Sequence, residues 1–320
     1  MKKFEPHPFI SGGVMQTIIG SQAKGKSELP EPLSHNIPIS SNVALALFEY
    51  SISNIDKGSI LLAHGMGGCS GSGYMKRIGA KLCRLGYRVF LINQRGSGPG
   101  MGMSDSLWNG GSSEDFAAIT DFIVGLYPDS QLKIIGFSLS GNILLKYLGE
   151  SKTIPPQVCS ALAFNPPADL RMASWLLSNE SRNRVFNVYY MGLIRAQIKA
   201  IKEKFPDAFL PTKHYKNIWE FDEVYTAPIN GYKDVEEYYD LCSGNRFMKE
   251  IQVPTHIVCS KDDPFIPPET FTEWPKSEAI VYTAPEKGGH MGYIERNKNG
   301  SGDRRWMDEF VSNWVEESSK

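Results

Sequence analysis

Cysteine is scarce in this sequence: the five cysteines are widely scattered, none of them forms a Cys-x-x-Cys pair, and their number is odd. A disulfide framework or a zinc site would need paired and more closely spaced cysteines. We therefore expect free thiols in a reducing compartment, and neither a metal site nor a bound cofactor is predicted.

Long apolar runs and an excess of one charge are also missing. No stretch approaches the roughly 18 uninterrupted apolar residues of a membrane span. Residues 1–8 (Met-Lys-Lys-Phe-Glu-Pro-His-Pro) supply no apolar segment of signal-peptide length. The 34 basic and 35 acidic residues give a formal net charge of −1, so no overall field favours nucleic acid or an anionic membrane. These absences predict a cytoplasmic protein without a transmembrane segment and without a nucleic-acid partner.

Internal repeats and low-complexity segments are absent too, and the 320 residues have an ordinary globular composition, 41% hydrophobic and 22% charged. From Ser59 onward, short apolar runs alternate with amphipathic stretches, which is typical of a parallel sheet with crossover helices. Strands are predicted at residues 60–63, 89–92, 132–135, 161–164, 256–258 and 279–282. Helices are predicted at residues 74–85, from 112 onward, at 141–148 and around 306–315.

Residues 168–250 interrupt this alternation, because they are rich in aromatic residues and helical in pattern. The sequence therefore predicts an α/β fold with a mostly parallel central sheet, helices on both faces and a helical lid insertion. We assign residues 1–165 and 251–320 to the body and residues 166–250 to the lid.

The strongest local motif is the segment 136–141 (Gly-Phe-Ser-Leu-Ser-Gly), which follows an apolar strand and precedes a helix. A nucleophile elbow holds its serine in a strained turn, so the residues two before and two after it must be small. The usual pattern is Gly-x-Ser-x-Gly, and Ser140 stands here in place of the second glycine. A Gly- and Ser-rich turn would have a similar sequence, but the strand–turn–helix context favours Ser138 as a nucleophile.

A serine hydroxyl is a poor nucleophile until a base takes its proton, so a histidine is required. His290 lies in the glycine-rich loop 288–292, between the last strand and the last helix, where the folds that use this elbow place their histidine. A plain turn residue is the alternative for His290, and its position favours the general base. The other histidines lie in the segment before the expected sheet (His7, His35), at a strand end (His64), in the insertion (His214) and within a strand (His256).

The acid that orients this histidine should follow the strand that resumes the sheet, where Asp262 and Asp263 stand side by side. A carboxylate there holds the imidazole in one tautomer and stabilises its charged form. We choose Asp263, because the acid in this loop commonly precedes a short turn such as 264–267 (Pro-Phe-Ile-Pro). Asp262 is then expected to support the turn.

The oxyanion of an acyl-transfer intermediate needs two preorganised N–H donors. One is expected from the backbone of Leu139, directly after the nucleophile, and the second from Met66 in the loop 64–68 (His-Gly-Met-Gly-Gly). A phosphate-binding loop is the other use of such glycines. It is not matched here, because neither Gly-Lys-Ser/Thr nor Gly-x-Gly-x-x-Gly is present.

Taken together, these motifs resemble the YheT-like branch of the α/β-hydrolases, which comprises bacterial proteins classed as esterases and eukaryotic lipid hydrolases. The resemblance implies the α/β-hydrolase fold, a charge relay of Ser138, Asp263 and His290, and no cofactor. Ser140, where most members have glycine, is the one departure at the site. The matching segments, in chain order, are residues 12–17, 64–68, 93–96, 136–139, 221–228, 231–232, 238–239, 262–265 and 288–292.

The expected function is hydrolysis of carboxylic esters, short- to medium-chain acyl esters with glycerides or phospholipids included, so the expected partner is a small-molecule ester. The apolar residues between 175 and 194 would suit an acyl chain, although they would equally pack the lid onto the body. The alternatives are a non-catalytic binding protein of the same fold and an acyltransferase that uses the same three residues. The sequence does not decide the oligomeric state.

Overall fold

The computed structural model describes residues 3–10, 12–22, 27–52, 57–296 and 304–318. The first two and last two residues of the predicted body, Met1, Lys2, Ser319 and Lys320, lie outside the described residues. Within the described ranges no helix is long and apolar enough to cross a membrane.

One eight-stranded sheet runs through the described residues, with the strand order β1-β2-β4-β3-β5-β6-β7-β8. The pairs β1–β2 and β2–β4 are antiparallel, and every other neighbouring pair is parallel. The strands are β1 (Leu33–Ser40), β2 (Val43–Tyr50), β3 (Ser59–Ala63), β4 (Arg88–Asn93), β5 (Leu132–Phe137), β6 (Val158–Phe164), β7 (Thr255–Val258) and β8 (Ile280–Thr283).

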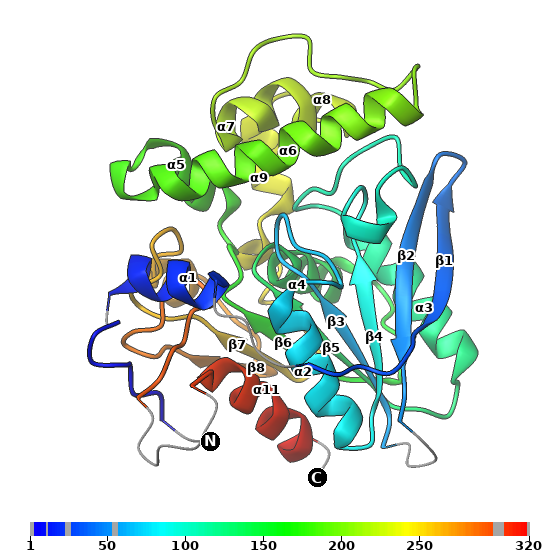
Figure 1. Ribbon diagram of the computed structural model, residues 1–320, viewed down its shortest axis with the longest axis vertical. Coiled ribbons are helices and arrows are strands. Elements are labelled where there is room, and N and C mark those ends of the chain that lie inside the picture. The colour runs from blue at the N-terminus through cyan, green and yellow to red at the C-terminus, as the bar shows by residue number, and fades with distance from the viewer. Residues whose placement is uncertain (1–2, 11, 23–26, 53–56, 297–303, 319–320) are drawn as a thin grey trace.

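Helices cover both faces of this sheet, as predicted; in Figure 1, α2 and α11 lie in front of it and α3 and α4 behind. The helices in the described ranges are α1 (Gly13–Gln22), α2 (Gly73–Arg84), α3 (Ser113–Leu126), α4 (Leu139–Glu150), α5 (Leu170–Asn179), α6 (Arg184–Lys204), α7 (Ile218–Phe221), α8 (Ala227–Ile229), α9 (Val235–Cys242), α10 (Glu269–Thr272) and α11 (Trp306–Glu317). Short turns of other helix types are η1 (Gly98–Gly100), η2 (Ser181–Asn183), η3 (Asp222–Thr226) and η4 (Gly244–Arg246).

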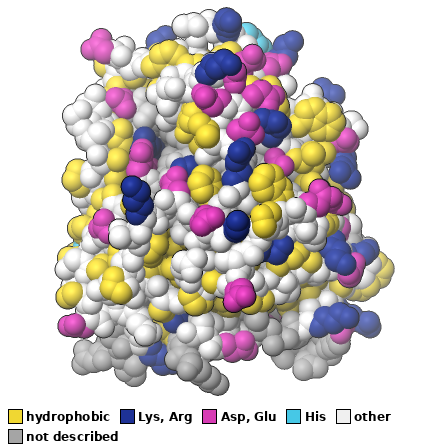
Figure 2. Space-filling view, turned by 180° about the vertical axis from the view of Figure 1, so that it is seen from behind, with side chains coloured by type: hydrophobic (Ala, Val, Ile, Leu, Met, Phe, Trp, Pro, Cys, Tyr) yellow, Lys and Arg dark blue, Asp and Glu magenta, His cyan; other side chains and the backbone are white. Residues whose placement is uncertain are grey.

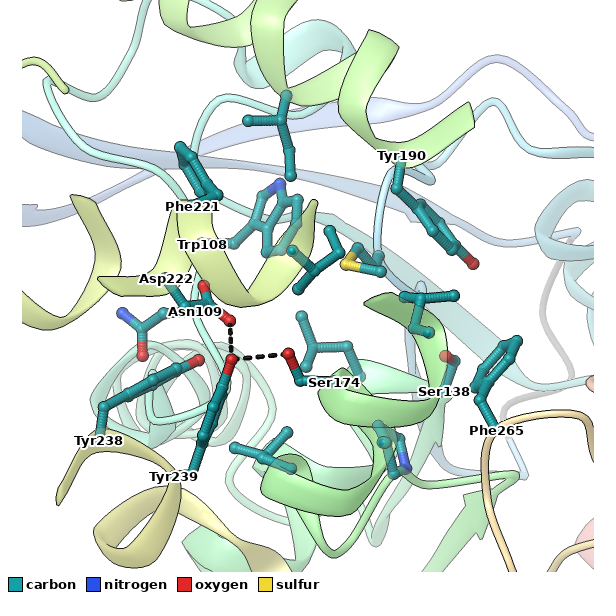
Figure 3. Close-up of a pocket in the computed structure, with 18 residues that line it drawn as sticks. Trp108, Asn109, Ser138, Ser174, Tyr190, Phe221, Asp222, Tyr238, Tyr239 and Phe265 are labelled. Carbon is teal, nitrogen blue, oxygen red and sulfur yellow. Dashed lines mark hydrogen bonds between the residues drawn. The ribbon is translucent and has the colours of Figure 1, made fainter. Parts of the chain in front are cut away.

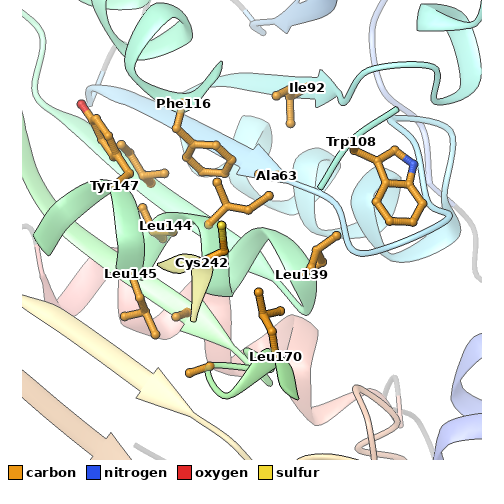
Figure 4. Packing of buried hydrophobic residues seen from close by; sticks show 14 of the residues in the cluster. Ala63, Ile92, Trp108, Phe116, Leu139, Leu144, Leu145, Tyr147, Leu170 and Cys242 are labelled. Atoms are coloured by element: carbon orange, nitrogen blue, oxygen red, sulfur yellow. The ribbon is translucent and has the colours of Figure 1, made fainter. Parts of the chain in front are cut away.

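The central strands are buried on both faces, and each face has its own hydrophobic core. Side chains alternate along a strand, so Ile60 and Leu62 of β3 join the core under α2 and α11, while Leu61 and Ala63 join the core under α3 and α4. Figure 4 shows Phe116 of α3 and Leu144 of α4 packing near Ala63 in the second core.

The prediction that the sheet begins at Ser59 is wrong, because β1 and β2 precede it and His35 is a residue of β1. β1 carries polar residues and a proline, and most of its side chains are exposed or half-buried. β2 is mostly buried along its whole length, so it has little of the polar alternation by which a half-buried strand is found.

Helix α3 begins at Ser113, one residue after the predicted start at residue 112. Ser112 makes no side-chain cap, and its hydroxyl instead accepts a hydrogen bond from the backbone N–H of Asn109. The acidic residues of the first turn lie at the positive end of the helix dipole. They also form ion pairs with Arg95, Glu114 at 2.7 Å and Asp115 at 2.6 Å.

Residues between β6 and β7 form helices α5 to α9, which Figure 1 shows gathered above one end of the sheet.

On the face seen in Figure 2, basic and acidic side chains are interspersed. The loops after β3, β5, β6, β7 and β8 lie at the carboxyl ends of parallel strands, where ligand sites of α/β sheets form.

Candidate active site

Ser138 lies in a tight turn between β5 and α4, with φ +51° and ψ −122°. Positive φ is uncommon for a residue with a side chain and persists only where the surroundings enforce it. A Cβ on Gly136 would lie 2.5 Å from the carbonyl oxygen of Ser140, and one on Gly141 would lie 2.9 Å from Cβ of Pro166. Both positions therefore require glycine, and the turn places the serine side chain at the carboxyl end of β5.

Ser140, the departure from the usual elbow pattern, is fully buried and connects the elbow to the loop after β3. Its hydroxyl donates to the carbonyl oxygen of His64 at 2.6 Å, and the Gln94 side-chain amide donates to the same carbonyl at 2.9 Å. Serine thus supplies a hydrogen bond that glycine cannot make.

His64 is neutral in this network. Its Nδ1 donates to the carbonyl oxygen of Gly65 at 2.8 Å, and its Nε2 accepts from the backbone N–H of Gln94 at 3.1 Å. Burial lowers the pKa of His64 to about 4, because the charged form would lose its hydration. Its side chain supports the loop that carries Met66.

Three of the predicted site residues are brought together at the carboxyl ends of β5, β7 and β8. The Ser138 hydroxyl lies 2.8 Å from Nε2 of His290, and Nδ1 of His290 lies 2.8 Å from Oδ2 of Asp263. A carboxylate can only accept, so Nδ1 carries the proton and Nε2 is left to accept the serine proton. All three side chains are buried.

Asp263, and not Asp262, contacts the imidazole. The other oxygen of Asp263 accepts hydrogen bonds from the backbone N–H groups of Phe265 and Ile266, at 3.1 and 3.2 Å. Asp262 instead accepts from the backbone N–H of Gly289 at 2.8 Å, so it holds the loop next to His290. Burial raises the pKa of Asp262.

The sequence reasoning missed Asn165, which directly follows β6 and has φ +47°. Its side-chain amide donates to Oδ2 of Asp263 at 2.7 Å and to the carbonyl oxygen of Gly289 at 3.2 Å. The hydroxyl of Tyr293 donates to Oδ1 of Asn165 at 2.9 Å and fixes the amide orientation. An asparagine at the carboxyl end of a parallel strand, a residue that tolerates positive φ, is the signal that could have indicated it.

Helix α1 supports the histidine loop, and this contact was also missed. The hydroxyl of Thr17 accepts a hydrogen bond from the backbone N–H of His290 at 2.8 Å. A Cβ on Gly289 would lie 2.2 Å from the carbonyl oxygen of Gly13, and one on Gly292 would lie 2.2 Å from that of Gln16. The glycines of the loop therefore allow α1 to approach at backbone distance.

The loop after β3 approaches Ser138 just as closely. A Cβ on Gly65 would lie 2.8 Å from Cβ of Ser138, so only glycine fits there. Neither the backbone N–H of Met66 nor that of Leu139 has an acceptor among the described residues, and both residues line the cavity that Ser138 faces. Their role as oxyanion donors stays a prediction.

Ser138 lies where two hollows meet. The first is a cavity of about 70 Å³ whose walls are almost entirely buried residues from the body and from α5, α6, α7, η3 and α9. The second is a cleft of about 430 Å³ that reaches the surface between α1 and α6 and is also lined by His290. Of the apolar residues at 175–194, Leu177 and Ile194 line the cavity and Phe186 lines the cleft, whereas Trp175 is 47% exposed and lines neither.

Asp222 is the one carboxyl group on the described wall of the cavity. Its two oxygens accept hydrogen bonds from the hydroxyls of Thr226 and Tyr239, at 2.6 and 2.8 Å. Burial raises its pKa to about 6, because desolvation outweighs these hydrogen bonds. No group of three or more His, Cys, Asp or Glu side chains in the described ranges is arranged to hold a metal ion.

The family model described as "alpha/beta hydrolase fold" matches residues 58–297 of this chain. The chain is an α/β hydrolase. The predicted fold class is thereby confirmed, and the hydrolase sheet carries Ser138, Asp263 and His290 on the loops that follow β5, β7 and β8.

Individual relatives agree with this family. The α/β hydrolase is 26% identical over 326 residues to the monoacylglycerol lipase ABHD2 of Danio rerio. This match covers 95% of this chain and 75% of the relative. It is 26% identical over 287 residues to YheT of Escherichia coli, covering 87% and 82% of the two chains, which confirms the resemblance to the YheT-like branch. The solved structure of the Pyrococcus furiosus esterase Pf2001 superposes with a TM-score of 0.57 at 15% identity, over 92% of this chain and 97% of that one.

Proposed function

We propose that this chain is a serine hydrolase that cleaves carboxylic esters through an acyl-enzyme intermediate on Ser138. The observation that carries the proposal is the pair of 2.8 Å contacts that link Ser138 to His290 and His290 to Asp263. The strained backbone of Ser138 supports it, because such strain is retained where function requires it. The ester class is supported by the relatives, which are named as a monoacylglycerol lipase and an esterase.

In the first step, Nε2 of His290 takes the Ser138 proton while the oxygen attacks the ester carbonyl. Asp263 stabilises the imidazolium that forms and keeps its Nδ1–H in place. The carbonyl oxygen becomes an oxyanion, which we assign to the backbone N–H groups of Met66 and Leu139. Collapse of the tetrahedral intermediate breaks the ester bond, and His290 returns its proton to the departing alcohol.

Deacylation repeats these roles with water. His290 takes a proton from the water, whose oxygen attacks the acyl carbonyl, and gives that proton to Ser138 as the acid leaves. The burial of all three side chains supports the scheme, since few bulk waters then compete with the charged intermediates. We further propose that residues 166–250 act as a lid, because their helices supply much of the cavity wall above Ser138.

A fluorophosphonate probe, together with p-nitrophenyl esters of two to sixteen carbons, tests this function. The wild type should label at one serine and hydrolyse part of the ester panel. Ser138→Ala should lose labelling and lower kcat by about 10⁶, while Ser140→Gly, the matched control, should keep labelling. Labelling that persists in Ser138→Ala would overturn the assignment. A wild type that binds ester but neither labels nor turns over would establish a binding protein, and product esters formed with an added alcohol would establish acyl transfer.

A further inference from the structure

The two hollows beside Ser138, the buried cavity and the surface cleft, are lined by different residues. In ester hydrolysis the histidine must reach the oxygen of the departing alcohol. His290 lines the surface cleft but not the buried cavity, so the cleft receives the alcohol and the buried cavity receives the acyl group. We call the buried cavity the acyl arm.

The acyl arm is apolar beside Ser138 and polar at its opposite side. Figure 3 shows Ser138 and Phe265 on one side of the cavity and Trp108, Asp222 and Tyr238 on the other. An arm built only for alkyl chains has no need of polar groups where the chain ends.

Two hydrogen-bond donors in this polar end have no acceptor in the described part of the chain. The indole N–H of Trp108 has none, although the residue is only 8% exposed. The hydroxyl of Tyr238, 3% exposed, accepts from the backbone N–H of Gly110 at 2.8 Å, and its own proton has no acceptor. Buried donors are nearly always paired, so two unpaired ones on one cavity wall require an explanation.

Acceptor capacity lies on the wall of the same cavity. Each oxygen of Asp222 accepts one hydrogen bond within the protein and retains a free lone pair. Asp222 is the first residue of the π-helix η3, an element that is rare and is often found at functional sites. With a pKa of about 6, this carboxyl is mostly ionised near neutral pH, so it acts there as a hydrogen-bond acceptor.

We propose that the acyl arm binds acyl groups that carry a hydroxyl at the end remote from the ester. A hydroxyl is both donor and acceptor, so it can accept from Trp108 or Tyr238 and donate to Asp222. A plain alkyl end leaves the two donors unpaired, and a carboxylate end is repelled by Asp222. The inference rests on the proposed ester hydrolysis at Ser138.

The test compares p-nitrophenyl esters of ω-hydroxyalkanoic acids with alkanoic esters of the same length, from four to twelve carbons. For the wild type, the ratio of kcat/KM between the hydroxylated and the plain ester should peak at one chain length and exceed about tenfold there. Trp108→Phe and Tyr238→Phe should each lower this ratio severalfold. Trp175→Phe, on an exposed residue that lines neither hollow, is the matched control and should keep the wild-type ratio.

A ratio at or below one at every length, or a ratio unchanged in both the Trp108 and Tyr238 variants, would overturn the inference. The acetyl ester and the fluorophosphonate probe report separately on the proposed function. If neither reacts, thermal denaturation with the matching ω-hydroxyalkanoic amides decides the point. A larger rise in Tm with the hydroxylated amide than with the plain one supports the polar arm, and equal shifts reject it.

Discussion

The side chains of Asp262 and Asp263 leave the same loop and reach different partners. One oxygen of Asp263 faces Nδ1 of His290, whereas Asp262 accepts from the backbone of Gly289. The contact of Asp263 keeps the imidazole proton on Nδ1 of His290. The contact of Asp262 holds the loop at Gly289 in place. Removing the negative charge should therefore have different consequences at the two positions.

Asp263→Asn should lower kcat by about 10⁴, because the amide would favour the wrong histidine tautomer. Asp262→Asn keeps an oxygen that can accept from Gly289 and should cost less than about tenfold. Steady-state kinetics on one short ester measures both effects, and circular dichroism controls for folding. A greater loss in the Asp262 variant would reverse the assignment.

The sequence predicted Ser138, Asp263 and His290 because a short motif surrounds each of them. The alternation of strands and loops gives the order of these motifs along the chain. It did not predict Asn165 or Tyr293, which complete the hydrogen bonding of Asp263. Asn165 follows a strand without a glycine-rich motif, and Tyr293 acts only through it. Asn165 and its partner Asp263 are 98 positions apart, so the sequence alone does not pair them.

At the scale of elements, α1 and the loop 288–292 form one unit around His290. Glycines face backbone carbonyls across the contact, and Thr17 binds the backbone of His290 directly. Both segments match family motifs in the sequence, but no periodicity relates a short N-terminal helix to a distant loop, so their contact could not be predicted. β1 and β2 were missed for a different reason, because β1 is polar and contains a proline and β2 lacks the polar alternation of a half-buried strand.

Gly289→Ala tests this contact. Gly289 has φ +58°, and its added Cβ would lie 2.2 Å from the carbonyl oxygen of Gly13, so the loop must move. We expect a loss of at least about 1 kcal/mol in the free energy of unfolding and about 100-fold in kcat. Gly192→Ala, where nothing lies within 4 Å of the added Cβ, should instead be neutral or stabilising. Urea denaturation and ester kinetics measure both variants, and wild-type behaviour of Gly289→Ala would contradict the contact.

Helix α6 should influence acyl-chain preference through Ile194, which is 1% exposed and lines the buried cavity. Ile194→Ala should move the optimum of the p-nitrophenyl ester series toward longer chains, since each CH₂ newly accommodated contributes up to about 0.8 kcal/mol. Phe186→Ala, in the cleft, should leave that optimum in place and change the preference for the alcohol. An equal loss on all esters in Ile194→Ala would return the residue to a packing role.

For the whole molecule, the buried carboxyl of Asp222 makes stability depend on pH. Its pKa in the folded protein, about 6, is above the ordinary value of 3.8, so the folded state binds its proton more tightly than the unfolded state does. The free energy of unfolding therefore falls as the pH rises from about 4 to about 6, and is constant for this group outside that window.

Asp222→Asn removes this titration. Compared with the wild type, the variant should show a flatter dependence of the free energy of unfolding between pH 4 and pH 6, with a difference of up to about 3 kcal/mol across the window. Urea denaturation at pH 4, 5, 6 and 7 measures it. Parallel curves for the two proteins would show that Asp222 titrates normally.

The contact between Thr17 and His290 joins residues 273 positions apart, and Gln16 binds Ile294 across 278 positions. Closing so long a loop is possible only after nearly the whole chain has been synthesised. The turn at Ser138, by contrast, contacts β5, α4 and residues 164–166, which all come much earlier in the chain than His290. If Ser138 and His290 act as proposed, a nascent chain should therefore gain its activity only when the C-terminal part of the chain has been made.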